Sequence, residues 1–173
     1  MNKNECICNT VGIVVVILLI LGTGVSTILL SSVYAQPTAT LGEPFLVEQG
    51  QITGQKEIGP DRTQFTYSSN GTLNGNIEIT GTGNFVSVSK DDNQAFDQGQ
   101  GVISIKDTGE TANYTFIEVD NATEEGKLVF LGAAVYNTNS TGELSFLNNV
   151  LEIFKGEQDV ESGNFVSTSW IVK

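Results

Sequence analysis

The sequence predicts an all-β domain, a single antiparallel up-and-down β-barrel of about eight strands. Some nine or ten short apolar runs follow residue 45, and polar turn clusters separate them at intervals of about 8–12 residues. No helical periodicity is present after residue 40. A closed barrel is favoured because it leaves no free strand edge in a domain without disulfides, and a two-sheet β-sandwich is the alternative.

A hydrophobic stretch precedes this domain. Residues 11–30 hold 14 Val, Ile or Leu residues and no charged residue. As a helix, a stretch of this length would span about 30 Å, which is the thickness of one hydrocarbon core. We therefore expect residues 1–35 to form a helix that is either a signal peptide or an N-terminal transmembrane anchor.

The two outcomes differ in cleavage. Val33 and Ala35 suit signal peptidase, which would cut between Ala35 and Gln36, whereas the length of the apolar run favours retention. Either outcome places the domain outside the cytoplasm, secreted or anchored to the cell membrane, and the first residue of the exported protein distinguishes them. Residues 36–44 contain two of the three prolines and are expected to be an extended linker, followed by the barrel domain at 45–173.

Turn and strand signals then follow in order. The Asn70-Gly71 pair predicts a hairpin turn, because both residues tolerate positive φ. Residues 98–101 (QGQG) predict a bulge or bend within a strand. Residues 127–136 are apolar on both faces, which predicts a strand covered on both sides. Residues 139–154 are expected to form the closing hairpin, as two short strands separated by Asn148-Asn149.

The composition excludes several kinds of chemistry. The chain has no histidine, and Cys6 and Cys8 both precede the apolar segment, so the domain has no imidazole base, thiol nucleophile or disulfide. Its 8 basic and 20 acidic residues give a net charge of −12, which disfavours binding to nucleic acid. These features argue against an enzyme, and no cofactor is expected.

Two acidic segments are candidates for a metal or catalytic site. Residues 91–97 (DDNQAFD) offer closely spaced oxygen ligands for calcium, but they lack the glycine and terminal glutamate of an EF-hand loop. We interpret them as a solvated turn. We interpret Glu118, Asp120, Glu124 and Glu125 as an acidic hairpin tip. No metal site is therefore expected.

Four asparagines begin the N-x-[ST] pattern of glycosylation acceptors. Asn70, Asn121 and Asn139 are expected in turns, and Asn113 is expected in a strand. In a chain without export-coupled glycosylation they would be ordinary polar residues.

Three stretches together resemble a family of uncharacterised secreted archaeal and bacterial proteins. These are residues 140–149 (STGELSFLNN), the tail from Gly163 to Lys173 with its single Trp170, and Gly99-Gln-Gly101. The resemblance implies a small calycin-like barrel over residues 45–173, similar in fold to lipocalins and allene oxide cyclase. It implies no catalytic residue, because fold alone does not determine function.

Three classes of function remain open. The domain could bind a small apolar ligand, act as a cell-surface or structural module with a packed barrel, or be a cyclase or isomerase with a polar group in the lumen. For the binding class we predict that one face of the final strand points inward, because the other face carries two serines. The predicted ligand-lining residues are Val166, Trp170, Val172, Tyr136 and Phe116.

Overall fold

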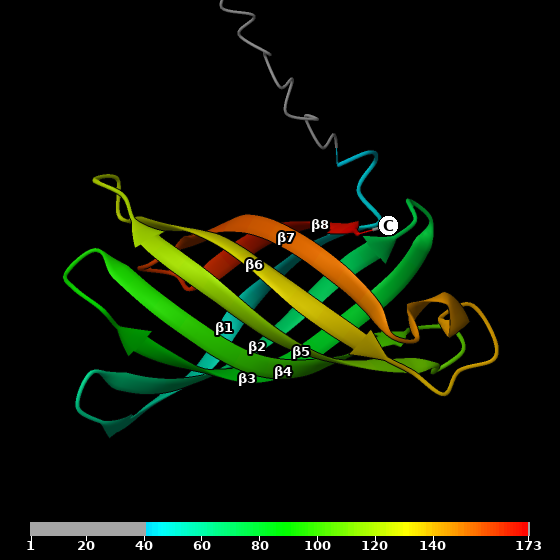
Figure 1. Ribbon diagram of the computed structural model, residues 1–173, viewed down its shortest axis with the longest axis horizontal. Coiled ribbons are helices and arrows are strands. Elements are labelled where there is room, and N and C mark those ends of the chain that lie inside the picture. The colour runs from blue at the N-terminus through cyan, green and yellow to red at the C-terminus, as the bar shows by residue number, and fades with distance from the viewer. Residues whose placement is uncertain (1–40, 173) are drawn as a thin grey trace, which may run out of the picture. The chain divides into compact units, whose positions relative to one another are not determined.

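The computed structural model describes residues 41–172, which form an all-β closed barrel of eight antiparallel strands (Figure 1). The predicted barrel is confirmed, and the sandwich alternative is wrong. Each strand pairs with its neighbours in the sequence, and β1 pairs with β8 to close the sheet. The strands are β1 (Leu46–Gly59), β2 (Arg62–Leu73), β3 (Ile77–Ser89), β4 (Gln94–Ile105), β5 (Thr111–Ala122), β6 (Lys127–Asn137), β7 (Val150–Asp159) and β8 (Asn164–Ile171).

The strands are longer and fewer than the apolar runs suggested. They have 8 to 14 residues each, and Asn70-Gly71 lies inside β2 rather than in a turn. The turn comes at Asn74-Gly75, where both residues have positive φ, 50° and 78°. The bulge predicted at residues 98–101 is also absent, since the pairing of β4 with β3 and β5 has no register shift there. Residue types that favour turns thus lie inside continuous strands of this barrel.

A short helix, rather than a strand, precedes β7. Residues Ser145–Leu147 form the 3-10 helix η1, in which the Leu147 N–H donates to the Leu144 carbonyl at 3.0 Å. The predicted first strand of the closing hairpin is thus wrong. Asn149 then adopts a left-handed φ of 59°, which redirects the chain into β7.

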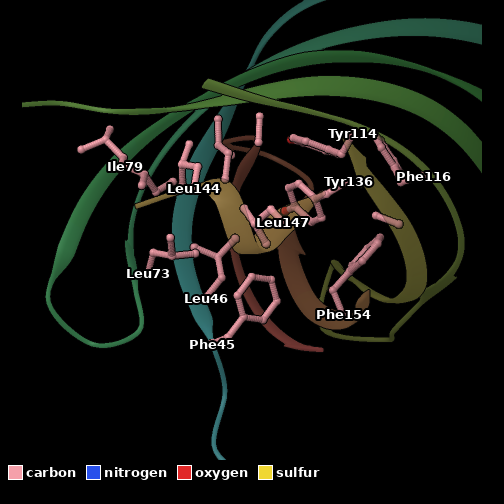
Figure 2. Packing of buried hydrophobic residues seen from close by; sticks show 14 of the residues in the cluster. Phe45, Leu46, Leu73, Ile79, Tyr114, Phe116, Tyr136, Leu144, Leu147 and Phe154 are labelled. Atoms are coloured by element: carbon pink, nitrogen blue, oxygen red, sulfur yellow. The ribbon is translucent and has the colours of Figure 1, made fainter. Parts of the chain in front are cut away.

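This helix closes one end of the barrel. Leu144 and Leu147 are fully buried, and they pack with Leu46, Leu73 and Ile79 in the apolar core (Figure 2). We call this end, where the β6–β7 connection and both ends of the described chain lie, the plugged end. The opposite end carries the β1–β2, β3–β4, β5–β6 and β7–β8 turns and is called the turn end.

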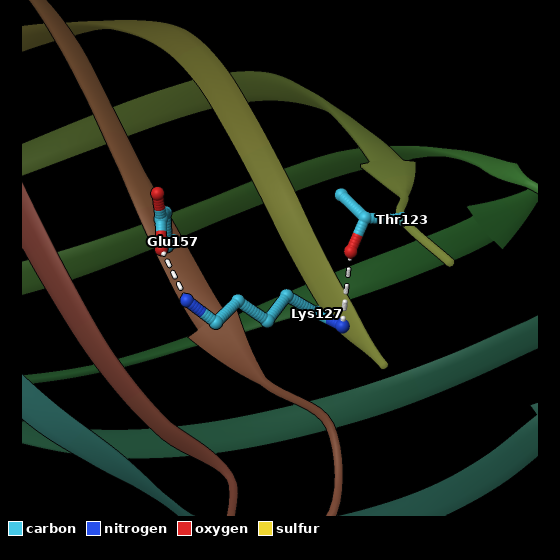
Figure 3. A network of polar contacts seen from close by, with 3 residues as sticks. All are labelled: Thr123, Lys127 and Glu157. Atoms are coloured by element: carbon cyan, nitrogen blue, oxygen red, sulfur yellow. Dashed lines mark hydrogen bonds and ion pairs between the residues drawn. The ribbon is translucent and has the colours of Figure 1, made fainter. Parts of the chain in front are cut away.

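The outer face of β6 is exposed, so the prediction of a strand covered on both sides is wrong. Val129, Leu131 and Val135 are 42%, 61% and 45% exposed. Charged groups also lie outside: Lys127 Nζ contacts Glu157 Oε2 at 3.0 Å, and the Lys127 backbone N–H donates to Thr123 Oγ1 (Figure 3). Exposed pairs of this kind contribute little to stability.

The expected signal peptide or anchor, with its cleavage site between Ala35 and Gln36, lies outside the described residues. Within residues 41–172, no helix is long and apolar enough to cross a bilayer. Residues 41–172 lie within one compact unit, and all eight strands and the whole apolar core of the described residues belong to it. This segment therefore contains what it needs to fold by itself.

We expect Leu147→Ala to destabilise the barrel by about 2–5 kcal/mol, because the change opens a cavity under the plugged end. Phe146→Ala is the matched control, since the neighbouring Phe146 is 37% exposed and should lose much less. Urea unfolding of residues 36–173 measures both. Equal losses for the two variants would contradict the packing described for η1.

Candidate functional site

The barrel interior contains a cavity of ≈ 70 Å³, whose lining extends from Glu48 and Glu152 toward the plugged end to Asp120 and Gln158 near the turn end. By the same measure one water molecule needs about 10–15 Å³, so the cavity has room for several waters or a small organic molecule. Aromatic rings and carboxyl groups form most of its lining, and no lysine or arginine is among the lining residues. The lining residues are Glu48, Ile52, Tyr67, Phe85, Tyr114, Phe116, Glu118, Asp120, Phe130, Tyr136, Glu152, Phe154, Gln158, Phe165 and Ser167.

Glycines in neighbouring strands create this space. Phe116 faces Gly99 across the β4–β5 pair, and Tyr114 faces Gly101. A Cβ added at either glycine would lie 2.5 Å from the facing ring, so each ring lies against the backbone of the next strand. Rings in this position follow the wall instead of filling the centre. The two glycines of the QGQG segment, which suggested a bulge, therefore leave room for two rings.

Two tyrosines meet in the middle of the barrel. The Oη atoms of Tyr67 and Tyr114 form a buried hydrogen bond of 2.5 Å. Burial raises the pKa of both phenols above the usual range, so both stay protonated at neutral pH. They provide the cavity with a fixed polar group among the rings.

Glu48 and Glu152 form a carboxyl pair toward the plugged end. Ser69 Oγ donates to Glu48 Oε2 at 3.0 Å, and Ser169 Oγ donates to Glu152 Oε1 at 3.3 Å. Glu152 Oε2 is buried and forms no hydrogen bond of ordinary geometry, although the nearby Tyr136 hydroxyl lowers the pKa of Glu152. Burial, followed by the charge of Glu48, raises the pKa of Glu152 from 4.5 to about 8, and burial also raises the pKa of Glu48.

A second group of carboxyls lies toward the turn end, and we call Asp97, Glu118 and Asp120 the acidic cluster. Asp97 of β4 pairs directly with Glu118 of β5, and Asp120 lies two residues further on the same face. One carboxyl oxygen from each lies within 4.8 Å of the other two. Burial raises the pKa of all three groups, and the repulsion among them adds to this for Glu118 and Asp120.

The interpretation of Asp97 as part of a solvated turn, and of Glu118 and Asp120 as part of a hairpin tip, is wrong. Asp97 is 1% exposed and Asp120 is 7% exposed, so neither lies in a solvated loop or hairpin tip. The sequence did contain a signal, because Tyr114, Phe116, Glu118 and Asp120 alternate along one strand and so share the inward face.

The predicted ligand-lining residues divide into two groups. Tyr136 and Phe116 line the cavity. Val166 and Val172 are 56% and 41% exposed, and Trp170 lies on the same outward face of β8, where its Nε1–H donates to the Gly42 carbonyl at 3.2 Å. The predicted orientation of β8 is therefore wrong. Its serines point inward because the carboxylate of Glu152 and the Lys155 carbonyl accept their hydroxyls.

The four candidate glycosylation asparagines are all exposed. Asn70 lies within β2 rather than in a turn, Asn113 lies in β5 as expected, and Asn121 lies near the end of β5. Asn139 lies in the β6–β7 connection. Exposure leaves each of them accessible to modification.

Comparisons with known proteins support the fold and indicate no function. No family model and no curated protein matches the chain. A conserved protein of unknown function from Rhodopseudomonas palustris superposes with a TM-score of 0.60 at 9% identity, covering 75% of this chain and 95% of that one. A protein of unknown function from Clostridium acetobutylicum superposes with a TM-score of 0.61 at 13% identity, covering 76% and 98%. The eight-strand barrel is consistent with a calycin-like fold, and these neighbours carry no assigned function.

The raised pKa of Glu152 makes stability depend on pH. A carboxyl with a raised pKa in the folded state contributes stability that is fully present below about pH 4.5 and is lost as the pH rises to about 8. We expect the free energy of unfolding of residues 36–173 to fall between pH 5 and pH 9. Glu152→Gln should reduce this fall by the order of a few kcal/mol, measured by urea unfolding at both pH values.

Glu57→Gln is the matched control for this experiment, because Glu57 is exposed on β1. It should keep the wild-type dependence on pH. If Glu152→Gln loses as much free energy of unfolding between pH 5 and pH 9 as the wild type does, Glu152 is not buried in its uncharged form.

Proposed function

We propose that the barrel binds a small organic cation with an apolar body in its central cavity. The proposal rests on the lining of the cavity, which combines aromatic rings and carboxyl groups without any lysine or arginine. A cation over aromatic faces gains electrostatic attraction, and this attraction is largest where water is excluded. The proposed setting is outside the cytoplasm, which rests on the apolar residues 11–30.

The carboxyl pair supplies the partner for the charged head. Glu152 Oε2 is buried without a hydrogen-bond partner, and a buried acceptor left unpaired is costly. An ammonium group beside Glu152 and Glu48 would satisfy this atom and neutralise the negative charge that forms. A ligand that is itself a carboxylate, such as a fatty acid, is disfavoured because it would enter a site lined by carboxyls.

The aromatic rings of the lining favour a ligand whose body is apolar. Three neighbouring rings line the cavity: Phe116, Phe154 and Tyr114. The ring centroid of Phe116 lies 6.1 Å from that of each of the other two. The cavity volume limits the ligand to a small molecule. Choline suits both requirements as a probe, because its hydroxyl can donate a hydrogen bond to Glu152 Oε2 and its quaternary ammonium group is of the kind bound by aromatic cages elsewhere.

We expect choline to bind residues 36–173 in calorimetric titration and to bind more tightly than its neutral isostere, 3,3-dimethyl-1-butanol. Because the cation must displace the proton of Glu152, choline affinity should rise by up to roughly tenfold per pH unit between pH 6 and pH 8. Glu152→Gln should weaken choline binding at least tenfold, whereas Glu57→Gln should leave it unchanged.

Two results would overturn the proposal. The first is that choline and the isostere bind equally well or not at all. The second is that the affinity of a bound ligand falls as the pH rises, which would indicate that Glu152 recognises a neutral acceptor through its proton.

A further inference from the structure

The acidic cluster is a second buried group of carboxyls, and the proposed binding of choline does not explain it. It lies near the turn end of the barrel, since Asp97 is close to the start of β4 and Asp120 is close to the end of β5. Glu118 and Asp120 also line the central cavity, and Asp97, which is not part of the lining, lies beside Glu118 on the paired strand. An ion entering through the cavity could therefore reach all three carboxyls.

Two acceptor atoms of the cluster form no hydrogen bond of ordinary geometry in the described part of the chain, although the side chains of Ser87 and Asp120 lie near enough to Asp97 to lower its pKa. Asp97 Oδ1 and Asp120 Oδ1 are buried and have no hydrogen-bond partner. The ion pairs found among residues 41–172 join Lys106 to Glu78 and Lys127 to Glu157, so neither brings a positive charge to the cluster. Buried carboxylates of this kind are normally paired with a cation or bound to a metal.

We propose that Asp97, Glu118 and Asp120 bind a divalent cation, with Ca²⁺ as the preferred ion. Two oxygens that each lie about 2.3–2.6 Å from one calcium ion can be at most about 5 Å apart. The three carboxyl oxygens lie within 4.8 Å of one another, so the spacing of each pair is within this limit. Calcium is preferred over magnesium because it accepts 6–8 oxygens in irregular geometry, and waters in the cavity can supply the remaining ligands.

This site differs from the calcium loop considered from the sequence. That hypothesis used the turn at residues 91–93, where Asp91 Oδ1 accepts the Asn93 backbone N–H at 2.8 Å and both Asp91 and Asp92 are exposed. The proposed site uses only Asp97 from that stretch and draws its other ligands from β5. Sequence spacing could not reveal it, because β4 and β5 bring the ligands together through pairing.

The test uses residues 36–173 after treatment with a chelator, titrated with CaCl₂ by calorimetry and followed by thermal unfolding. We expect one saturable calcium site and a rise of several degrees in the unfolding temperature at saturation. Asp97→Asn and Asp120→Asn should each weaken calcium binding at least tenfold and remove the thermal shift. Asp92→Asn, in the exposed turn, should bind calcium as the wild type does.

The variants should fold, because asparagine replaces a buried carboxyl by a neutral group of the same shape, and circular dichroism checks this. Absence of saturable calcium binding by the wild type overturns the proposal whatever the variants do. Loss of binding in Asp92→Asn with retention in Asp97→Asn also overturns it and returns the site to the turn. Binding of MgCl₂ as tight as that of CaCl₂ overturns the choice of ion.

Discussion

The contact between an aromatic ring and a glycine of the neighbouring strand is the constraint on which the interior depends. Gly99 with Phe116 and Gly101 with Tyr114 show it most clearly, because a side chain at either glycine would collide with the facing ring. A shift of one residue in the pairing would move the rings to the outside and the glycines out of register. Barrel closure, strand register and the central cavity therefore rest on the same contacts.

The two ends of the barrel differ in the polarity of their inward side chains. At the plugged end, Leu144 and Leu147 fill the interior with apolar side chains that need no partner (Figure 2). From Glu48 and Glu152 to the turn end, the inward positions also carry carboxyls and tyrosine hydroxyls. The basic side chains that form ion pairs do so on the outer surface (Figure 3). Burial of carboxyls without a nearby cation costs stability as they ionise. Binding of a cation from solution would offset this cost.

The general fold could be predicted from the sequence because alternation and turn spacing are local properties. The orientation of β8 could not, because it depends on partners in other strands. The prediction placed Ser167 and Ser169 outside on the reasoning that buried hydroxyls lose hydration, but Glu152 and the Lys155 carbonyl accept their hydrogen bonds. Tyr136 and Phe116, predicted from the sequence as ligand-lining residues, lie at the cavity, and their contact with a ligand stays a prediction. The acidic cluster was missed because its members were judged by the turns near them rather than by strand parity.

The most direct test of this account is the infrared spectrum of residues 36–173 at pH 7 without ligand. We expect a carbonyl stretching band from a protonated carboxylic acid, because burial raises the pKa of Glu152 to about 8. This band should be reduced in Glu152→Gln and should weaken when choline saturates the cavity. A spectrum in which every carboxyl is ionised at pH 7 would contradict the account.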